Sequence, residues 1–120
     1  MGLQVGREIA LSSCFMIHHL VLFKLKPETD EEKVEWMMRE TRIQLLKIPG
    51  VLSVRCGKKI EPDTEWPFFL VVEIESMDKL RAYRDDPVHL KFVEEVIKPN
   101  VVERLALDHE MEPGKDVLYS

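Results

Sequence analysis

The sequence contains only two cysteines and no closely spaced cysteine pair. Cys14 and Cys56 lie far apart, which excludes a zinc ribbon or a Cys-x-x-Cys redox motif. Scarce cysteine is typical of a reducing compartment, and we expect a cytoplasmic protein. No stretch approaches the ~18 consecutive apolar residues of a membrane span, so we expect no membrane partner.

The string LSSC, which ends at Cys14, looks like the cleavage box of a bacterial lipoprotein. A signal peptide of that kind requires an apolar region of about 7 to 15 residues before the box. Arg7 and Glu8 interrupt the region here. We therefore predict that the chain is not lipidated.

Basic residues are too few and too scattered for nucleic-acid recognition. Lys and Arg number 17 against 22 Asp and Glu, and the net charge is -5. Phosphate recognition needs a concentrated basic surface, so we expect no nucleic-acid partner. The five glycines do not form a phosphate-binding loop, and we expect neither a nucleotide nor any other cofactor.

What the sequence does contain is one domain of strand and helix patterns. Its 120 residues, of which 45% are hydrophobic, are enough for one core but not for two. Residues 1–15 show no clear periodicity, and the first strong signal follows Met16. We therefore expect a flexible N-terminal extension (1–15), a domain (16–111) and a C-terminal tail (112–120).

Apolar periodicity and turn residues predict seven elements. Runs rich in β-branched and aromatic residues predict strands over 17–25, 51–60, 68–74 and 101–109. Helical spacing predicts helices over 30–47, 77–84 and 87–97. Thr29 and Glu32 have the spacing of a capping box, and Ser76 is a typical N-cap. Pro87 suits a first helical turn and splits the second helical region in two.

Helical spacing also predicts which side chains face the core. In the first helix the expected apolar stripe is Val34, Met37, Met38, Leu45 and Ile48. In the last helix the expected buried line is Leu90, Val93 and Ile97. Gly57, inside the second strand, predicts a β-bulge or a close approach of a neighbouring side chain.

The resulting order, β-α-β-β-α-β with the second helix split, predicts an α+β ferredoxin-like sandwich. In such a fold the helices cover one face of the four-stranded sheet. The first and third strands are apolar on both sides, so the other face needs cover as well. Pairing the bare faces of two copies would supply it, and we expect a homodimer through the open sheet face, a dimeric α/β barrel.

The run YRDDPVHLKF, residues 83–92, carries the candidate chemistry. Tyr83 and His89, two side chains capable of proton transfer, lie six positions apart there. The alternative interpretation is structural. His89 would then fix the helix start or satisfy a buried carbonyl, and Tyr83 would only pack its ring. Asp85 and Asp86 would favour a charged imidazole and weaken His89 as a base.

Three blocks of the sequence resemble the stress-responsive dimeric A/B barrel (Dabb) family. They are MIHHLVLFKLKP from Met16, IPGVLSVRCG from Ile48, and the run at residues 83–92. The resemblance covers about residues 16 to 111. The late Leu107, Asp108 and His109 resemble the family's closing Asp-plus-aromatic pair, with histidine in place of the aromatic residue.

The Dabb family includes a plant polyketide cyclase that forms olivetolic acid, and the resemblance implies roles for three residues. His89 falls on its general base, Tyr83 on the residue that polarises a carbonyl oxygen, and His19 on a histidine of the first strand. An imidazole titrates near neutral pH and a phenol can donate to a developing oxyanion, so such a mechanism needs no cofactor.

Two functional hypotheses follow. In the first, the homodimer binds a small apolar or aromatic molecule in a cavity between sheet and helices, without turnover. In the second, it is a cofactor-independent cyclase, isomerase, lyase or small monooxygenase that uses His89 and Tyr83.

A metal is a weaker alternative. His18 and His19 are adjacent, so they face opposite sides of a strand and cannot share one ion. His19, His89 and a carboxylate would suit a transition metal, but we predict none.

Overall fold

The computed structural model describes residues 15–112. Except for Phe15 and Glu112, the expected N-terminal extension and C-terminal tail lie outside that range, as does Cys14. None of the helices in the described range is both long enough and apolar enough to cross a membrane.

The order of elements is the predicted one, and the α+β ferredoxin-like fold is confirmed. The elements are β1 (Met16–Leu25), α2 (Glu31–Leu45), β2 (Val51–Lys58), β3 (Phe68–Ile74), α3 (Met77–Asp85), α4 (Pro87–Phe92), a π-helical turn (Val93–Ile97) and β4 (Val101–Met111). The four strands form one sheet in the order β2-β3-β1-β4, and each neighbouring pair is antiparallel.

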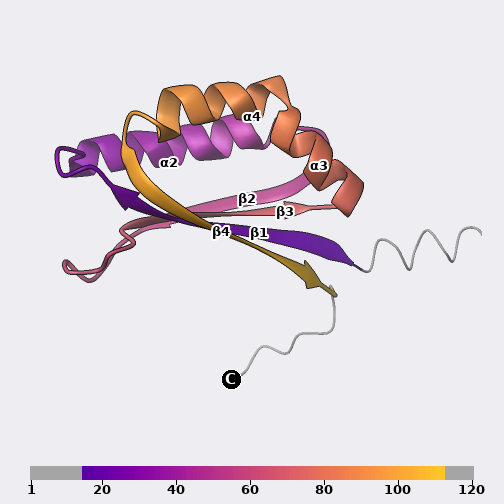
Figure 1. Ribbon diagram of the computed structural model, residues 1–120, viewed down its shortest axis with the longest axis horizontal. Coiled ribbons are helices and arrows are strands. Elements are labelled where there is room, and N and C mark those ends of the chain that lie inside the picture. Colours follow the sequence, from indigo (N-terminus) through magenta and orange to yellow (C-terminus); the bar gives the residue numbers. More distant parts are fainter. Residues whose placement is uncertain (1–14, 113–120) are drawn as a thin grey trace, which may run out of the picture.

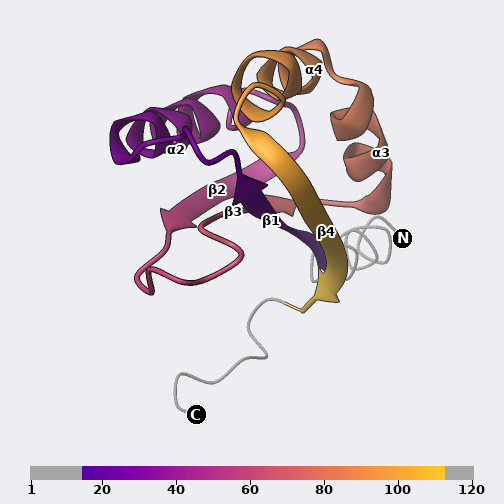
Figure 2. The same cartoon turned by 60° about the vertical axis from the view of Figure 1, so that its left-hand side comes forward.

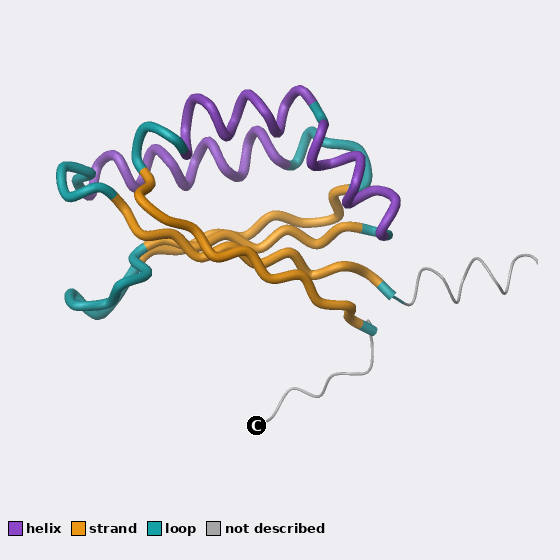
Figure 3. Tube along the Cα trace, viewed as in Figure 1, coloured by secondary structure: helices purple, strands orange, loops and turns teal. Residues whose placement is uncertain are grey.

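The molecule has two layers (Figure 1). The helices lie together on one face of the sheet, and nothing in the described range covers the other face, as the separation of purple helices from orange strands in Figure 3 makes plain. Figure 2 shows the same layers from another side, with β4 along one edge of the sheet. The core therefore lies between one sheet face and the helices.

Strand β1 contributes to both faces of the sheet. Ile17, Val21 and Phe23 point to the helices and are buried. The alternate residues His18, Leu20 and Leu22 belong to the uncovered side, which we call the open face. Cross-strand register places an apolar group at its centre. Its members are Leu20, Leu22, Phe69, Val71, Leu105 and Leu107.

Helices α2 and α3 each begin at a residue whose side chain caps the helix. One of the two predicted caps is wrong. Asp30, not Thr29, caps α2, and its carboxylate accepts from the Lys33 N–H at 2.8 Å. The predicted Thr29 capping box is wrong because the Thr29 hydroxyl turns instead to the Asn100 carbonyl, at 3.4 Å. Ser76 caps α3 as predicted.

The predicted buried line of the last helix is partly wrong. Leu90 is 52% exposed, whereas Phe92, Val96 and Ile97 are in the core. The cause is the π-helical turn, in which the Lys98 N–H bonds the Val93 carbonyl at 2.9 Å. A π-turn holds one residue more than an α-turn, so it shifts the helical register and sends two consecutive side chains inward.

Gly57 is a point of close approach, as predicted, and not a bulge. It pairs with Phe69 across β2 and β3, and a Cβ on Gly57 would lie 2.5 Å from Phe69 Cε1. The irregular register lies earlier in β2, between Val51 and Ser53. The aromatic ring of Phe69 therefore covers the backbone of Gly57, an arrangement known to support glycine in strands.

Replacing Gly57 by alanine is expected to lower the free energy of unfolding by about 1 to 3 kcal/mol, because the new methyl group displaces the Phe69 ring. Urea unfolding measures the change. The double variant Gly57→Ala, Phe69→Leu removes the clashing ring atoms, so the alanine should cost less in that background. An equal cost in both backgrounds would contradict the proposed contact.

Candidate functional site

The junction of α3 and α4 brings Tyr83 and His89 together. Tyr83 lies in the last turn of α3 and His89 in the first turn of α4. Between them Asp86 caps α4 by accepting from the Val88 N–H at 2.8 Å. The sharp turn stacks the two rings, with centroids 4.5 Å apart and planes inclined by 38°.

His19 reaches the same place from β1. Its ring meets Tyr83 edge to face, at a centroid distance of 5.7 Å. All three site residues expected from the sequence therefore form one cluster, with Tyr83 in the middle.

The His89 ring is held in one tautomer. Its Nδ1 lies 3.2 Å from the Arg84 carbonyl, and a carbonyl only accepts, so Nδ1 carries the proton and Nε2 keeps its lone pair. Burial lowers the pKa of His89, and the nearby His19 and Arg104 lower it further. The contact with Arg84 and the charge of Asp86 oppose this shift but are outweighed. Asp86 thus favours the charged imidazole, as expected, but the net shift of the His89 pKa is downward.

Tyr83 is buried, with 2% of its surface exposed. Burial, aided by the negative charge of Asp108, raises the pKa of its phenol, which stays neutral at pH 7. The hydroxyl makes no hydrogen bond to residues 15–112, and no side-chain atom of that range is both fully buried and unpaired. The Tyr83 side chain lines the adjoining cavity, and its hydroxyl has no partner among residues 15–112.

Sequence reasoning missed an acidic residue that supports His19. Asp108 pairs with His19 across β1 and β4, and its Oδ1 lies 2.5 Å from His19 Nδ1. Its other oxygen accepts from the Arg84 guanidinium at 3.3 Å. Because the carboxylate only accepts, His19 Nδ1 carries the proton in this contact. The other ring nitrogen, Nε2, does not contact Asp108. The Leu-Asp-His block was a family marker, but only the strand register reveals this contact.

These side chains border a cavity of about 210 Å³ between the sheet and the helices. Its polar wall residues are His19, Tyr83, His89 and Arg104. The rest of the wall is apolar, made by Val21, Phe23, Leu70, Leu90, Phe92, Val93 and Ile97. The volume is below the ~300 Å³ at which pockets for drug-sized ligands begin. The cavity therefore suits a molecule of about one ring.

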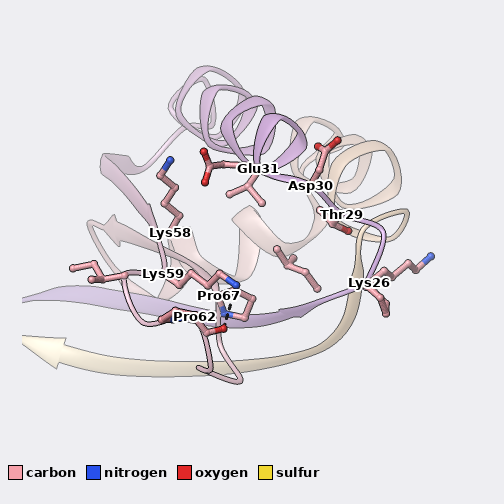
Figure 4. Close-up of a pocket in the computed structure, with 12 residues that line it drawn as sticks. Lys26, Thr29, Asp30, Glu31, Lys58, Lys59, Pro62 and Pro67 are labelled. Carbon is pink, nitrogen blue, oxygen red and sulfur yellow. Dashed lines mark hydrogen bonds between the residues drawn. The ribbon is translucent and has the colours of Figure 1, made fainter.

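A larger cavity, of about 500 Å³, lies where the start of α2 faces the β2–β3 loop (Figure 4). Two lysines on its wall are engaged with other groups. Lys58 pairs with Glu35 at 2.5 Å, and Lys59 donates to the Pro62 carbonyl at 3.3 Å. None of the predicted site residues lies here, and the sequence did not indicate this cavity.

Within residues 15–112, no three His, Cys, Asp or Glu side chains are grouped so as to hold a metal ion. The alternative of a site from His19, His89 and a carboxylate is therefore not assembled. Cys56 is half-buried, and its burial raises the pKa of the thiol, which suits a packed side chain better than a nucleophile.

The architecture and the cavity define a class: a ferredoxin-like α+β protein with a histidine–tyrosine cluster between sheet and helices. The sequence pattern of the Stress responsive A/B Barrel Domain (Dabb) matches residues 17–111. The chain belongs to the Dabb family.

Solved structures share the fold. A Dabb family protein with a ferredoxin-like fold from Mesorhizobium loti is 26% identical, with a TM-score of 0.69 over 79% of this chain and 95% of that one. A dimeric ferredoxin-like protein of unknown function from Thermobifida fusca is 23% identical, with a TM-score of 0.70 over 79% and 90%. The hydroxynitrile lyase of Passiflora edulis is 13% identical, with a TM-score of 0.70 over 82% and 94%. A search of curated proteins finds no match.

The burial of His89 generates a prediction about its titration. NMR should place the pKa of His89 below the usual value of about 6.5. Replacing Leu90, a wall residue, by alanine admits water and should raise that pKa. Ile43, 53% exposed and on α2, is the matched control, and Ile43→Ala should leave the titration unchanged. An unshifted pKa of His89 in the parent protein would contradict the burial of its ring.

Proposed function

We propose that the protein binds a small apolar or aromatic molecule in the cavity bordered by Tyr83 and His89. One observation carries the proposal: a mostly apolar cavity whose wall includes the clustered rings of His19, Tyr83 and His89, the usual composition of a small-molecule site. The Tyr83 hydroxyl and the Nε2 atoms of His19 and His89 lack protein partners among residues 15–112. They are available to hydrogen-bond an oxygen-bearing ligand.

We further propose that two copies pair through the open face. Leu105 and Leu107 on this face are 42% and 38% exposed, and their cross-strand partners Leu22 and Leu20 extend the apolar group. Burying such a surface against a second copy is favourable, at roughly 25 cal/mol per Å² of apolar area. The Thermobifida fusca protein of the same fold is dimeric, which supports the pairing of two copies.

A second candidate function is cofactor-independent catalysis, favoured by the fixed tautomer of His89. A neutral imidazole with a free Nε2 is a base, and the neutral Tyr83 phenol is a donor to a carbonyl oxygen. In cleavage of a hydroxynitrile, for example, Nε2 would take the hydroxyl proton. The carbon–carbon bond would then break, leaving a carbonyl compound, and cyanide would leave with the electron pair and take up the proton.

The dimer is tested by a charge placed on the open face. Light scattering at micromolar concentration should return twice the chain mass for the parent protein and the single-chain mass for Leu105→Glu, because the glutamate would be buried without a partner. The matched control Ile43→Glu adds the same charge on the helix side and should remain dimeric. A monomeric parent protein would refute the proposed pairing.

Ligand binding is tested by filling the cavity. NMR titration with 4-nitrobenzamide, a neutral single-ring probe, should shift the signals of wall residues saturably. Leu90→Trp places a large side chain at the cavity and should abolish the shifts, whereas Ile43→Trp at a similarly exposed site should keep them. Shifts that persist in Leu90→Trp, or that never appear in the parent protein, would rule out this cavity as the site.

Catalysis is tested with mandelonitrile, chosen because of the fold shared with a hydroxynitrile lyase. If the chain is a lyase, benzaldehyde should form and His89→Gln should lower the rate at least about 100-fold, the usual contribution of a general base. The rate should rise with pH through the lowered pKa of His89, since only the neutral ring accepts a proton. No turnover, or turnover unaffected by His89→Gln, would refute this lyase mechanism.

A further inference from the structure

Arg104 is the one permanently charged residue on the wall of the 210 Å³ cavity, and no Asp, Glu or Lys side chain lines it. The residue lies on β4, opposite Phe23 of β1 in the cross-strand register. This pairing places Arg104 on the helix-facing side of the sheet. The sequence alone gave no reason to select it among 17 basic residues.

The position of Arg104 marks the mouth of the cavity. Both Arg104 and Leu90 line the cavity and are also exposed to solvent. One belongs to the edge strand β4 and the other to α4, so the opening lies between these two elements. A ligand that enters there passes the Arg104 guanidinium before it reaches the buried ring of Tyr83.

The guanidinium of Arg104 has no ion-pair partner within the described residues. It takes part in none of the ion pairs or side-chain hydrogen bonds found in the range 15–112, whereas the nearby Arg84 donates to Asp108. Asp108 in turn contacts His19. Asp108 is thus already bonded to two partners, Asp86 caps α4, and Arg104 has no counterion within residues 15–112.

The surroundings therefore favour a negative ligand. Burial lowers the pKa of His89 and raises that of Tyr83, which stays protonated, so Arg104 is the permanent charge on the wall, and no Asp or Glu side chain lines it. An apolar wall strengthens the attraction between Arg104 and an anion, because the local dielectric is lower than in water.

We propose that the cavity takes a small monoanion with an apolar or aromatic body, and that Arg104 binds its carboxylate at the mouth. Guanidinium and carboxylate pair in a planar, two-point geometry. The body then extends toward Phe23 and Leu70, with any carbonyl or hydroxyl group near Tyr83. The inference rests on the proposed ligand-binding function and adds to it a ligand class and a specificity-determining residue.

The test compares two probes that differ in charge but hardly in shape, 4-nitrobenzoate and 4-nitrobenzamide. Dissociation constants come from NMR titration at low ionic strength. In the parent protein the benzoate should bind about tenfold more tightly, as expected for one hydrogen-bonded charge. In Arg104→Gln this preference should disappear, while the affinity for the amide stays the same. Arg104→Lys should restore part of it, since lysine keeps the charge but not the two-point geometry.

Arg39→Gln is the matched control, because it removes the same charge from an exposed site outside the cavity wall. It should preserve the preference for the benzoate. Equal affinity for both probes in the parent protein would overturn the inference and leave the proposed binding function standing. A preference for the benzoate that survives in Arg104→Gln would have the same two consequences. If neither probe binds, the binding function itself fails.

Discussion

The sheet of this protein has two apolar faces, and that constraint shapes everything else. Strands β1 and β3 carry apolar side chains on both sides, yet one layer of helices covers only one of them. Water contact with the open face is unfavourable in proportion to its apolar area. The requirement for a second cover is therefore present in the strands themselves, before any residue of the candidate site is considered.

The helices do not cover the whole of their own sheet face either. The cavity lies at the border of the part that they cover. The helices pack over β1, β2 and β3, whereas the residues in the middle of β4 are exposed. The short α4 and its π-helical turn send Phe92, Val96 and Ile97 inward and leave Leu90 at the border. Polar groups at such a border are desolvated enough to have shifted pKa values and still reachable from solvent, a combination typical of functional sites.

Much of this architecture could be predicted from the sequence. Alternating apolar residues and turn signals predicted the order of elements, and Pro87 predicted the split that stacks Tyr83 on His89. Thr29 was wrongly predicted as the cap because Asp30, one residue later, offers an equally suitable oxygen. The exposed Leu90 was missed because an α-helical period cannot predict a π-turn.

The supporting residues of the site could not be predicted, for a different reason. Asp108 and Arg104 act through their positions opposite His19 and Phe23, and those positions depend on the pairing of β1 with β4. A slip of one residue would move both side chains to the open face. The pattern of a single strand does not contain that register. The sequence therefore identified His19, Tyr83 and His89 as candidate site residues, but not Asp108 or Arg104.

Strand β4 also bears on the behaviour of the protein at high concentration. It is 11 residues long and forms one edge of the sheet, so its outer N–H and C=O groups have no neighbouring strand in the described range. Free edges of this length invite pairing with other chains, and charged side chains are a common protection. Glu103, Arg104, Asp108 and Glu110 all lie on this strand. Arg104 and Asp108, which lie beside the cavity, thus also place charge on the free edge of the sheet, where it disfavours pairing with another chain.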